Sequence, residues 1–516
     1  MPTLEWQTEQ IRDKINQITL SPTVMLFNSL SYLIFFPTVA VVYFLLPQRW
    51  QRWWLLSVSC FFYLLFIPIY IFVLFLTIII DYGAGLLIEQ NKEKNRKKFY
   101  LIVSIISTAA ILFIFKYFNF FNANFNALSE FLHWNYSLTA LKIILPIGLS
   151  FHTFQSLSYV IEVYRGKQKA ERNLITYSLY VMFFPQLVAG PIERPQNLLH
   201  QFYESHVFDY QRFADGLGLM LWGFFKKIVI ADNAAGLVNV VYDNPANLTG
   251  IHFILATVLF AFQIYCDFSG YSDIAIGSAK TLGFDLMKNF DRPYSAKSIA
   301  EFWRRWHISL STWFMDYVYI PVGGNRLGKF KTYRNLLIVF MVSGLWHGAN
   351  WTFVLWGALH GAYLIIGKMT ESVRRVVVNL TRINRFPNVL DFMRMSAVFL
   401  LVNIAWIFFR ANSIGDGWLI FTNLTTGLPE LALNLTNLDY LKNILGKFGV
   451  GPRGFSQIWI FIILMIIIYR YKGSRNIRQA LADKPTLIRR GFYYFLILLI
   501  LFFGNFGELP FIYFQF

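Results

Sequence analysis

Two short motifs set a histidine beside tryptophans within otherwise apolar sequence. They read Phe-Trp-Arg-Arg-Trp-His at 302–307 and Gly-Leu-Trp-His-Gly at 344–348. A charged Arg or Asp at membrane depth costs about 2.5–3.5 kcal/mol on insertion scales, so ionisable groups in such sequence usually mark function. Because a neutral imidazole can accept a proton near pH 7, His307 and His347 are candidates for general acid–base catalysis.

His347 is the stronger of the two candidates. It follows an apolar run and lies between Gly344 and Gly348, whose small size lets a helix or a substrate approach the backbone closely. The alternative is a histidine that only hydrogen-bonds to a neighbouring helix, but the glycines and the second histidine favour catalysis. His360 lies thirteen residues further on, about 140° around one continuous helix, so we expect a structural role for it.

His307 is expected on a helix over residues 298–316. On such a helix Trp303, His307 and Ser311 share one face. One interpretation is an interfacial helix whose arginines meet lipid phosphates. The other is a helix that lines a reaction chamber and offers Arg304 and Arg305 to an anionic substrate.

Two aspartates, Asp267 and Asp273, fall within a predicted membrane span. A carboxylate at that depth requires a partner, and we expect structural ion pairs. The candidate partners are Arg292, Arg304 and Arg305.

Basic residues at two further places could bind an anionic substrate. Lys226 and Lys227 lie at a helix end, and residues 323–326 read Gly-Gly-Asn-Arg, where free amides and the Arg326 guanidinium could hold phosphate. The sequence has no Gly-x-x-x-x-Gly-Lys-Ser/Thr, Gly-x-Ser-x-Gly or His-Glu-x-x-His motif. ATP hydrolysis, serine hydrolysis and zinc proteolysis therefore lack support.

The composition is that of a multi-pass membrane protein. Of the 516 residues, 56% are hydrophobic and only 14% are charged, whereas soluble domains average about 25% charged. Long apolar runs predict helices rather than barrel strands, so we expect an all-α fold. The net charge of +18 fits an excess of Lys and Arg in cytoplasmic loops and does not indicate nucleic-acid binding. Cys60 and Cys266 predict neither a disulfide framework nor a metal site.

Apolar runs of about 20 residues suit membrane spans, and shorter or Pro-interrupted runs suit re-entrant pieces buried in protein. We expect spans near 25–46, 53–66, 69–88, 99–116, 141–163, 174–190, 213–241, 251–280, 334–346, 351–368, 391–410, 456–471 and 489–504. Residues 1–24 are polar and are interpreted as an N-terminal extension. Residues 25–516 then form a single membrane-embedded domain with a motif-bearing core at 140–370.

Several motifs together resemble those of the membrane-bound O-acyltransferase family. They are Asp-Phe-Ser-Gly-Tyr-Ser-Asp at 267–273, Phe-Trp-Arg-Arg-Trp-His-Ile-Ser-Leu-Ser at 302–311 and Gly-Leu-Trp-His-Gly at 344–348. Gly-Gly-Asn-Arg at 323–326 and Phe-Pro-Gln-Leu-Val-Ala-Gly-Pro at 184–191 are most similar to the alginate O-acetyltransferase branch. The resemblance runs from Met25 to about residue 370.

This resemblance implies a ring of helices around a central tunnel, with re-entrant segments, in a bacterial inner membrane. It implies that an acetyl group from cytoplasmic acetyl-CoA is passed outward, with no permanently bound cofactor and no metal. It makes the histidine at position 347 catalytic, with His307 assisting. The partners implied are an extracytoplasmic acyltransferase and a polysaccharide such as alginate or peptidoglycan, besides membrane lipids. The candidate residues for binding the CoA phosphates are Lys226, Lys227, Arg304, Arg305 and Arg326.

Other functions remain open from the sequence. The same fold could transfer D-alanyl or lipid acyl groups. A flippase or transporter for polysaccharide or lipid would line a solute path with the same buried polar residues, and would move its substrate without consuming an acyl donor.

Overall fold

The structure is a computed structural model that describes residues 25–514 except 137, 189, 474, 476 and 508. Across these residues the regular elements are helical, and seven helices are long and apolar enough to cross a membrane. They are Pro68–Gln90, Lys94–Phe131, Gly250–Thr281, Trp351–Met369, Pro387–Arg410, Pro452–Lys472 and Thr486–Phe503. The predicted all-α, multi-pass fold is confirmed. The predicted extension at 1–24 lies outside the described residues.

The chain divides into two compact units. Among the described residues, the first comprises those from 25 to 222, 271–287 and 513–514, and the second comprises Gly223–Gly270 and Lys288–Ile512. Both histidine motifs lie in the second unit. The central tunnel and the motif-bearing core stay predictions.

The apolar runs predict several of the helices in the first unit, but not Phe118–Phe131 or Pro195–Leu198. Its helices are α2 (Leu30–Leu45), α3 (Gln48–Leu64), α4 (Ile71–Gln90), α5 (Lys94–Leu112), α6 (Phe118–Phe131), α7 (Leu149–Tyr164), α8 (Leu174–Met182), α9 (Phe184–Leu187), α10 (Pro195–Leu198) and α11 (Tyr210–Phe224). The predicted span 174–190 is interrupted at Phe183, because Pro185 lacks an N–H and its ring would clash with the carbonyl four residues earlier.

A buried carboxylate joins three helices of this unit. Asp81 of α4 accepts hydrogen bonds from Ser104 (2.5 Å) and Thr108 (3.2 Å) of α5, and from Ser156 of α7. The three hydroxyls supply the hydrogen-bond donors that a buried carboxyl group requires inside an apolar bundle. The bundle can therefore accommodate Asp81.

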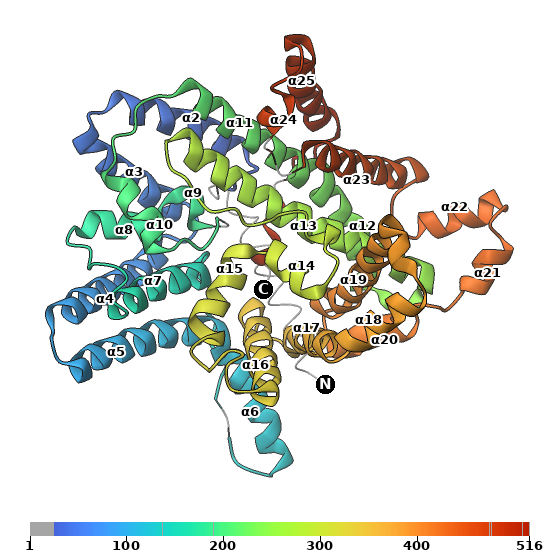
Figure 1. The fold of residues 1–516 in the computed structure, drawn as a ribbon, viewed down its shortest axis with the longest axis horizontal. Helices are drawn as coiled ribbons and strands as arrows, with labels where there is room; N and C mark the ends of the chain where they lie inside the picture. The colour runs from blue at the N-terminus through green and yellow to red at the C-terminus, as the bar shows by residue number, and fades with distance from the viewer. Residues whose placement is uncertain are drawn as a thin grey trace. The chain divides into compact units, whose positions relative to one another are not determined.

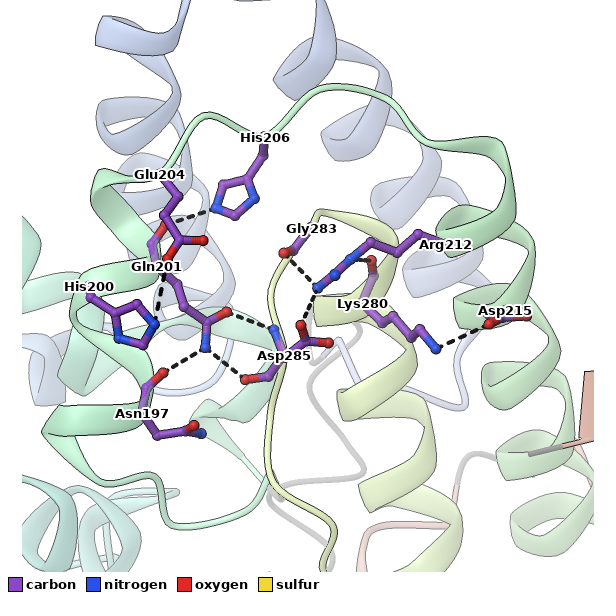
Figure 2. Close-up of polar contacts among 10 residues, drawn as sticks. All are labelled: Asn197, His200, Gln201, Glu204, His206, Arg212, Asp215, Lys280, Gly283 and Asp285. Atoms are coloured by element: carbon purple, nitrogen blue, oxygen red, sulfur yellow. Dashed lines mark hydrogen bonds and ion pairs between the residues drawn. The ribbon is translucent and has the colours of Figure 1, made fainter. Parts of the chain in front are cut away.

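A polar network fixes the loop that follows residue 281 (Figure 2). The Gln201 side chain pairs with the backbone of Asp285, accepting from its N–H (2.8 Å) and donating to its carbonyl (3.0 Å). Arg212 reaches the Asp285 carboxylate (3.0 Å), and Lys280 pairs with Asp215 (3.2 Å). Side chains thereby replace the regular backbone pairing that a loop lacks.

The second unit carries the helices that position the site, and one of them, Gly250–Thr281, continues into the first unit from Tyr271. They are α12 (Asp232–Asp243), α13 (Gly250–Thr281), α14 (Ile299–Arg305), α15 (Ile308–Phe314), α16 (Lys329–His347), α17 (Trp351–Met369), α18 (Glu371–Leu380), α19 (Pro387–Arg410), α20 (Ile414–Thr422), α21 (Leu428–Leu433), α22 (Leu438–Gly446), α23 (Pro452–Lys472), α24 (Ile477–Leu481) and α25 (Thr486–Phe503). A π-helical segment, Phe225–Ala231, joins α11 to α12. Three fully buried tryptophans of the second unit pack together, since the Trp406 ring lies 5.2 Å from that of Trp306 and 5.8 Å from that of Trp356.

Helices α16 and α17 form a tight hairpin (Figure 1). The side chain of Asn350 accepts a hydrogen bond from the Thr352 N–H (3.0 Å) and so caps α17. A Cβ on Gly357 would lie 2.2 Å from the Phe340 carbonyl oxygen. The two backbones approach this closely only because a glycine stands at the crossing.

Replacement of Gly357 by alanine is therefore expected to force the hairpin apart and to destabilise the protein by about 1–3 kcal/mol, the usual cost of overpacking. Thermal unfolding in detergent measures the effect. Gly367→Ala on the same helix is the matched control, because a Cβ there meets nothing within 4 Å. Equal unfolding temperatures for the two variants would show that the crossing tolerates a methyl group.

Candidate active site

His347 is enclosed by aromatic side chains from three helices. It is the last residue of α16 and is 2% exposed. Its ring centroid lies 4.9 Å from Trp346, 4.9 Å from Trp356 of α17 and 5.5 Å from Phe409 of α19. The imidazole therefore faces the interior of the protein, as ionisable side chains of membrane proteins almost always do.

His307 does not lie within a helix, so the predicted continuous helix over 298–316 is wrong. Helix α14 ends at Arg305, Trp306 is extended, and His307 has a left-handed backbone with φ of 43° before α15 begins. The three residues predicted to share a helical face, at positions 303, 307 and 311, therefore do not form that face.

A distant segment causes this break. The carbonyl of Asn289 accepts a hydrogen bond from the Ile308 N–H (2.9 Å). The Asn289 side-chain oxygen accepts from the Ser309 N–H (3.3 Å) and from the Ser309 hydroxyl (3.0 Å). These bonds satisfy donors at the start of α15 that an unbroken helix would satisfy internally. Arg305 is bound on the other side of the break, where its carbonyl accepts from the Asp291 N–H (2.9 Å).

Burial sets the charge of His307. The residue is fully buried, and its ring lies 4.6 Å from that of Phe268. It lies outside the seven candidate spans, and burial lowers the pKa of the imidazole to about 3. His307 is therefore neutral at physiological pH, with one ring nitrogen carrying a proton and the other able to accept one.

One indole contacts both candidate histidines. The Trp346 ring lies 4.9 Å from that of His347 and 6.1 Å from that of His307. The structure thus brings together two motifs that are forty residues apart in the sequence. Aromatic rings surround both imidazoles and keep the local dielectric constant low, which strengthens any hydrogen bond formed there.

His360 lies closer to this cluster than its sequence position suggests. Because α16 ends at His347 and α17 begins at Trp351, the two histidines are not on one continuous helix, and that expectation is wrong. The His360 ring lies 5.0 Å from Trp356, and its Nδ1 accepts a hydrogen bond from the Trp303 indole N–H (3.3 Å). This bond fixes the Trp303 indole and agrees with the structural role predicted for His360.

The partner of Asp267 is a lysine, not one of the predicted arginines. Lys227 Nζ lies 2.7 Å from Asp267 and 2.6 Å from Asp232. The side chains of all three residues are at most 4% exposed. Of the predicted partners, Arg292 pairs with Asp291 instead. A buried lysine shared between two carboxyl groups holds the π-helical segment, α12 and α13 together.

A segment far along the chain joins this ion pair. The second oxygen of Asp267 accepts a hydrogen bond from the Ile512 N–H (2.7 Å). The neighbouring Phe511 ring lies 5.3 Å from Phe268, which contacts His307. The sequence did not predict this connection. Asp267 within a predicted span indicated that a buried carboxylate needs a partner, but no pattern pointed to the Ile512 backbone.

The predicted donor-binding residues fall into two groups. Lys227 is held in the buried ion pair, and Lys226, 1% exposed, donates to the Ser269 hydroxyl (2.8 Å). Arg304 and Arg326 are exposed. Arg305 is partly exposed and pairs with Glu301 (2.6 Å). Within the described residues no group of three or more His, Cys, Asp or Glu side chains could hold a metal ion.

Comparison with known proteins decides the family. The membrane-bound O-acyltransferase family model matches residues 168–409, which include both histidine motifs. A probable alginate O-acetylase of Pseudomonas aeruginosa is 39% identical over 90% of this chain and 87% of its own length. The chain belongs to the membrane-bound O-acyltransferase family. It is therefore an O-acyltransferase and a multi-pass membrane protein, as predicted.

Two further relatives of this acyltransferase cover most of its length. A probable alginate O-acetylase of Azotobacter vinelandii is 37% identical over 84% of this chain and 86% of its own length. A peptidoglycan O-acetyltransferase of Helicobacter pylori is 35% identical over 89% of this chain and 91% of its own length. The branch predicted from the motifs, that of alginate O-acetyltransferases, is confirmed.

Proposed function

We propose that this acyltransferase takes an acetyl group from cytoplasmic acetyl-CoA and passes it across a bacterial inner membrane for O-acetylation of an extracytoplasmic polysaccharide. The names of the alginate and peptidoglycan acetylating relatives support the acetyl group and the polymer class. The structural observation that carries the proposal is the meeting of two buried imidazoles at Trp346.

The two imidazoles suit the chemistry of acyl transfer. An acceptor hydroxyl attacks the thioester carbonyl, so a C–O bond forms and the C–S bond breaks. His347 takes the hydroxyl proton and returns it to the CoA thiolate, while a neutral His307 or an indole N–H donates to the oxyanion. General-base help contributes about 10²–10⁴-fold, and removing an oxyanion donor costs about 10²–10³-fold.

The acetyl donor needs cations for its phosphates. Arg304 and Arg326 are exposed, and in the described part of the chain neither side chain forms an ion pair, so both are free to meet a ligand. Lys227 is already committed to two carboxylates and is not part of the proposed donor site. Lys226 and Arg305 remain candidates that would exchange their present partners for phosphate.

We expect Arg304→Gln and Arg326→Gln each to raise the KM for acetyl-CoA by about 10-fold or more, since a hydrogen bond to a charged group contributes about 1.5–3 kcal/mol. The kcat should change little, because the phosphates lie away from the reacting carbonyl. Initial rates in proteoliposomes at varied acetyl-CoA measure both constants. Arg453→Gln, another exposed arginine, is the control. An unchanged KM removes the tested arginine from the donor site.

The proposed reaction is tested with acetyl-labelled CoA. Purified protein in proteoliposomes, with an acceptor polymer and its extracytoplasmic transferase partner, should release CoA and form labelled ester in equal amounts. Mass spectrometry of envelope polymers after gene deletion should show loss of O-acetyl groups. Loss of D-alanyl esters instead would identify the alternative acyl group. Polymer movement without thioester consumption would indicate a transporter and contradict the proposal.

A further inference from the structure

Helix α18 is almost entirely exposed, because the rest of the protein covers little of it. Nine of its ten residues, Glu371–Leu380, are exposed. A helix of this length is marginal in water, because nucleation is costly and few hydrogen bonds form. Something other than protein packing must therefore stabilise α18.

The exposed residues of α18 are sorted by polarity. Val373, Val376, Val377 and Leu380 follow one another at helical spacing and form a stripe about 100° wide. These side chains are 50–78% exposed, so most of the stripe is left uncovered by the rest of the unit. Helices that present such a stripe while carrying arginines on the other side lie in the plane of a membrane surface.

The neighbouring helices place α18 at that surface. Helix α17 ends at Met369, a single residue separates it from α18, and α19 begins at Pro387. Both are long and apolar enough to span the membrane. The 17 residues between them, 370–386, therefore connect two spans on one side of the membrane and lie next to its surface.

This connection is strongly basic. Residues 370–386 contain four arginines and one acidic residue, Glu371, which pairs with Arg375 (2.6 Å). The Arg374 guanidinium binds the Gly367 carbonyl. Among the described residues, the exposed side chains of Arg382 and Arg385 have no hydrogen bond or ion pair. Clusters of basic residues beside a membrane span attract anionic headgroups, with about 1 kcal/mol for each residue near the surface.

We propose that α18 lies in the membrane interface, with its valine stripe among the acyl chains and with Arg382 and Arg385 on the phosphates of anionic phospholipids. The stripe provides apolar contact, and the two arginines provide selectivity for headgroup charge. This lipid site is independent of the acyl-transfer chemistry and would remain if the acyl donor or acceptor were different.

Depth measurements on the full chain in nanodiscs test the placement. Single cysteines at Val376→Cys, Val377→Cys and Asn379→Cys, in a background without Cys60 and Cys266, carry a nitroxide label. Labels at 376 and 377 should collide more often with oxygen, which partitions into lipid, than with a water-soluble nickel chelate. The label at 379, on the polar side, should show the reverse. Nickel access at all three positions, or protection of all three from both reagents, overturns the placement.

Lipid retention tests the headgroup preference. Native mass spectrometry compares bound phosphatidylglycerol with bound phosphatidylcholine after exchange in mixed micelles. The ratio should fall by at least about fivefold in the Arg382→Gln/Arg385→Gln variant, the factor that corresponds to about 1 kcal/mol for one basic residue. Lys442→Gln/Lys447→Gln removes the same charge from α22 and from the residue that follows it, and should leave the ratio unchanged. An equal ratio in the wild type and the arginine variant, or an equal fall in the control, overturns the preference.

Discussion

Replacement of His347 by alanine is expected to lower acetyl transfer by about 10²–10⁴-fold, the usual contribution of a positioned general base. The imidazole lies 4.9 Å from two tryptophan rings and is 2% exposed. Bulk water therefore has little access to this position and cannot act as the base when the imidazole is removed. The rate of ester formation from labelled acetyl-CoA measures the loss. The loss of rate should appear in kcat rather than in KM, because His347 acts on the reacting hydroxyl and not on the CoA phosphates.

His360→Gln is the matched control for this prediction. The His360 ring lies 5.0 Å from the same indole, that of Trp356, and His360 is fully buried. Its loss should lower the unfolding temperature by removing the Trp303 hydrogen bond, with a far smaller effect on the rate per folded molecule. Comparable rate losses in the two variants would assign both histidines to packing and would remove His347 from catalysis.

Lys227→Met should have the largest effect on stability. Removal of one partner from a buried ion pair costs about 3–5 kcal/mol, because the remaining charge stays buried without compensation. Here two carboxylates, Asp232 and Asp267, would lose their shared cation. Thermal unfolding in detergent measures the effect, and the variant should also loosen the Ile512 hydrogen bond on Asp267.

Two further variants separate charge from packing at this ion pair. Lys227→Met combined with Asp232→Asn and Asp267→Asn removes all three charges and should recover much of the lost stability. Lys442→Met breaks an exposed pair with Asp439 and should change stability by less than about 0.5 kcal/mol. A Lys227→Met protein as stable as the wild type would contradict the assignment of a buried cation to this position.

Local sequence patterns predict much of this fold. Long apolar runs give the helical spans because every backbone group in lipid must be paired within the protein, and a helix does this within its own segment. The hairpin break before α17 was also predictable, since Gly348 and Asn350 read as a helix stop followed by an N-cap. The predicted spans 334–346 and 351–368 already separate here, and only the estimate for His360 assumed one continuous helix.

Contacts between distant segments were not predictable in the same way. The break at His307 depends on Asn289, whose hydrogen bonds to Ile308 and Ser309 have no local sequence signal. The cation for Asp267 comes from Lys227, forty residues earlier, although three arginines lie nearer in the sequence on its other side. Residue type alone could not choose among these cations, because the choice depends on which helices pack together.

The left-handed backbone of His307 has a consequence for how this position can be studied. A backbone φ near 43° is tolerated best by Asn, Asp, His and Gly, and other residues at such a position cost about 1–3 kcal/mol in backbone strain. In a saturation mutagenesis library at position 307, most variants would therefore lose stability through backbone strain. Their activity would fall whether or not the imidazole takes part in the reaction. Asparagine is the informative reference allele, because it keeps the backbone and changes only the side-chain chemistry.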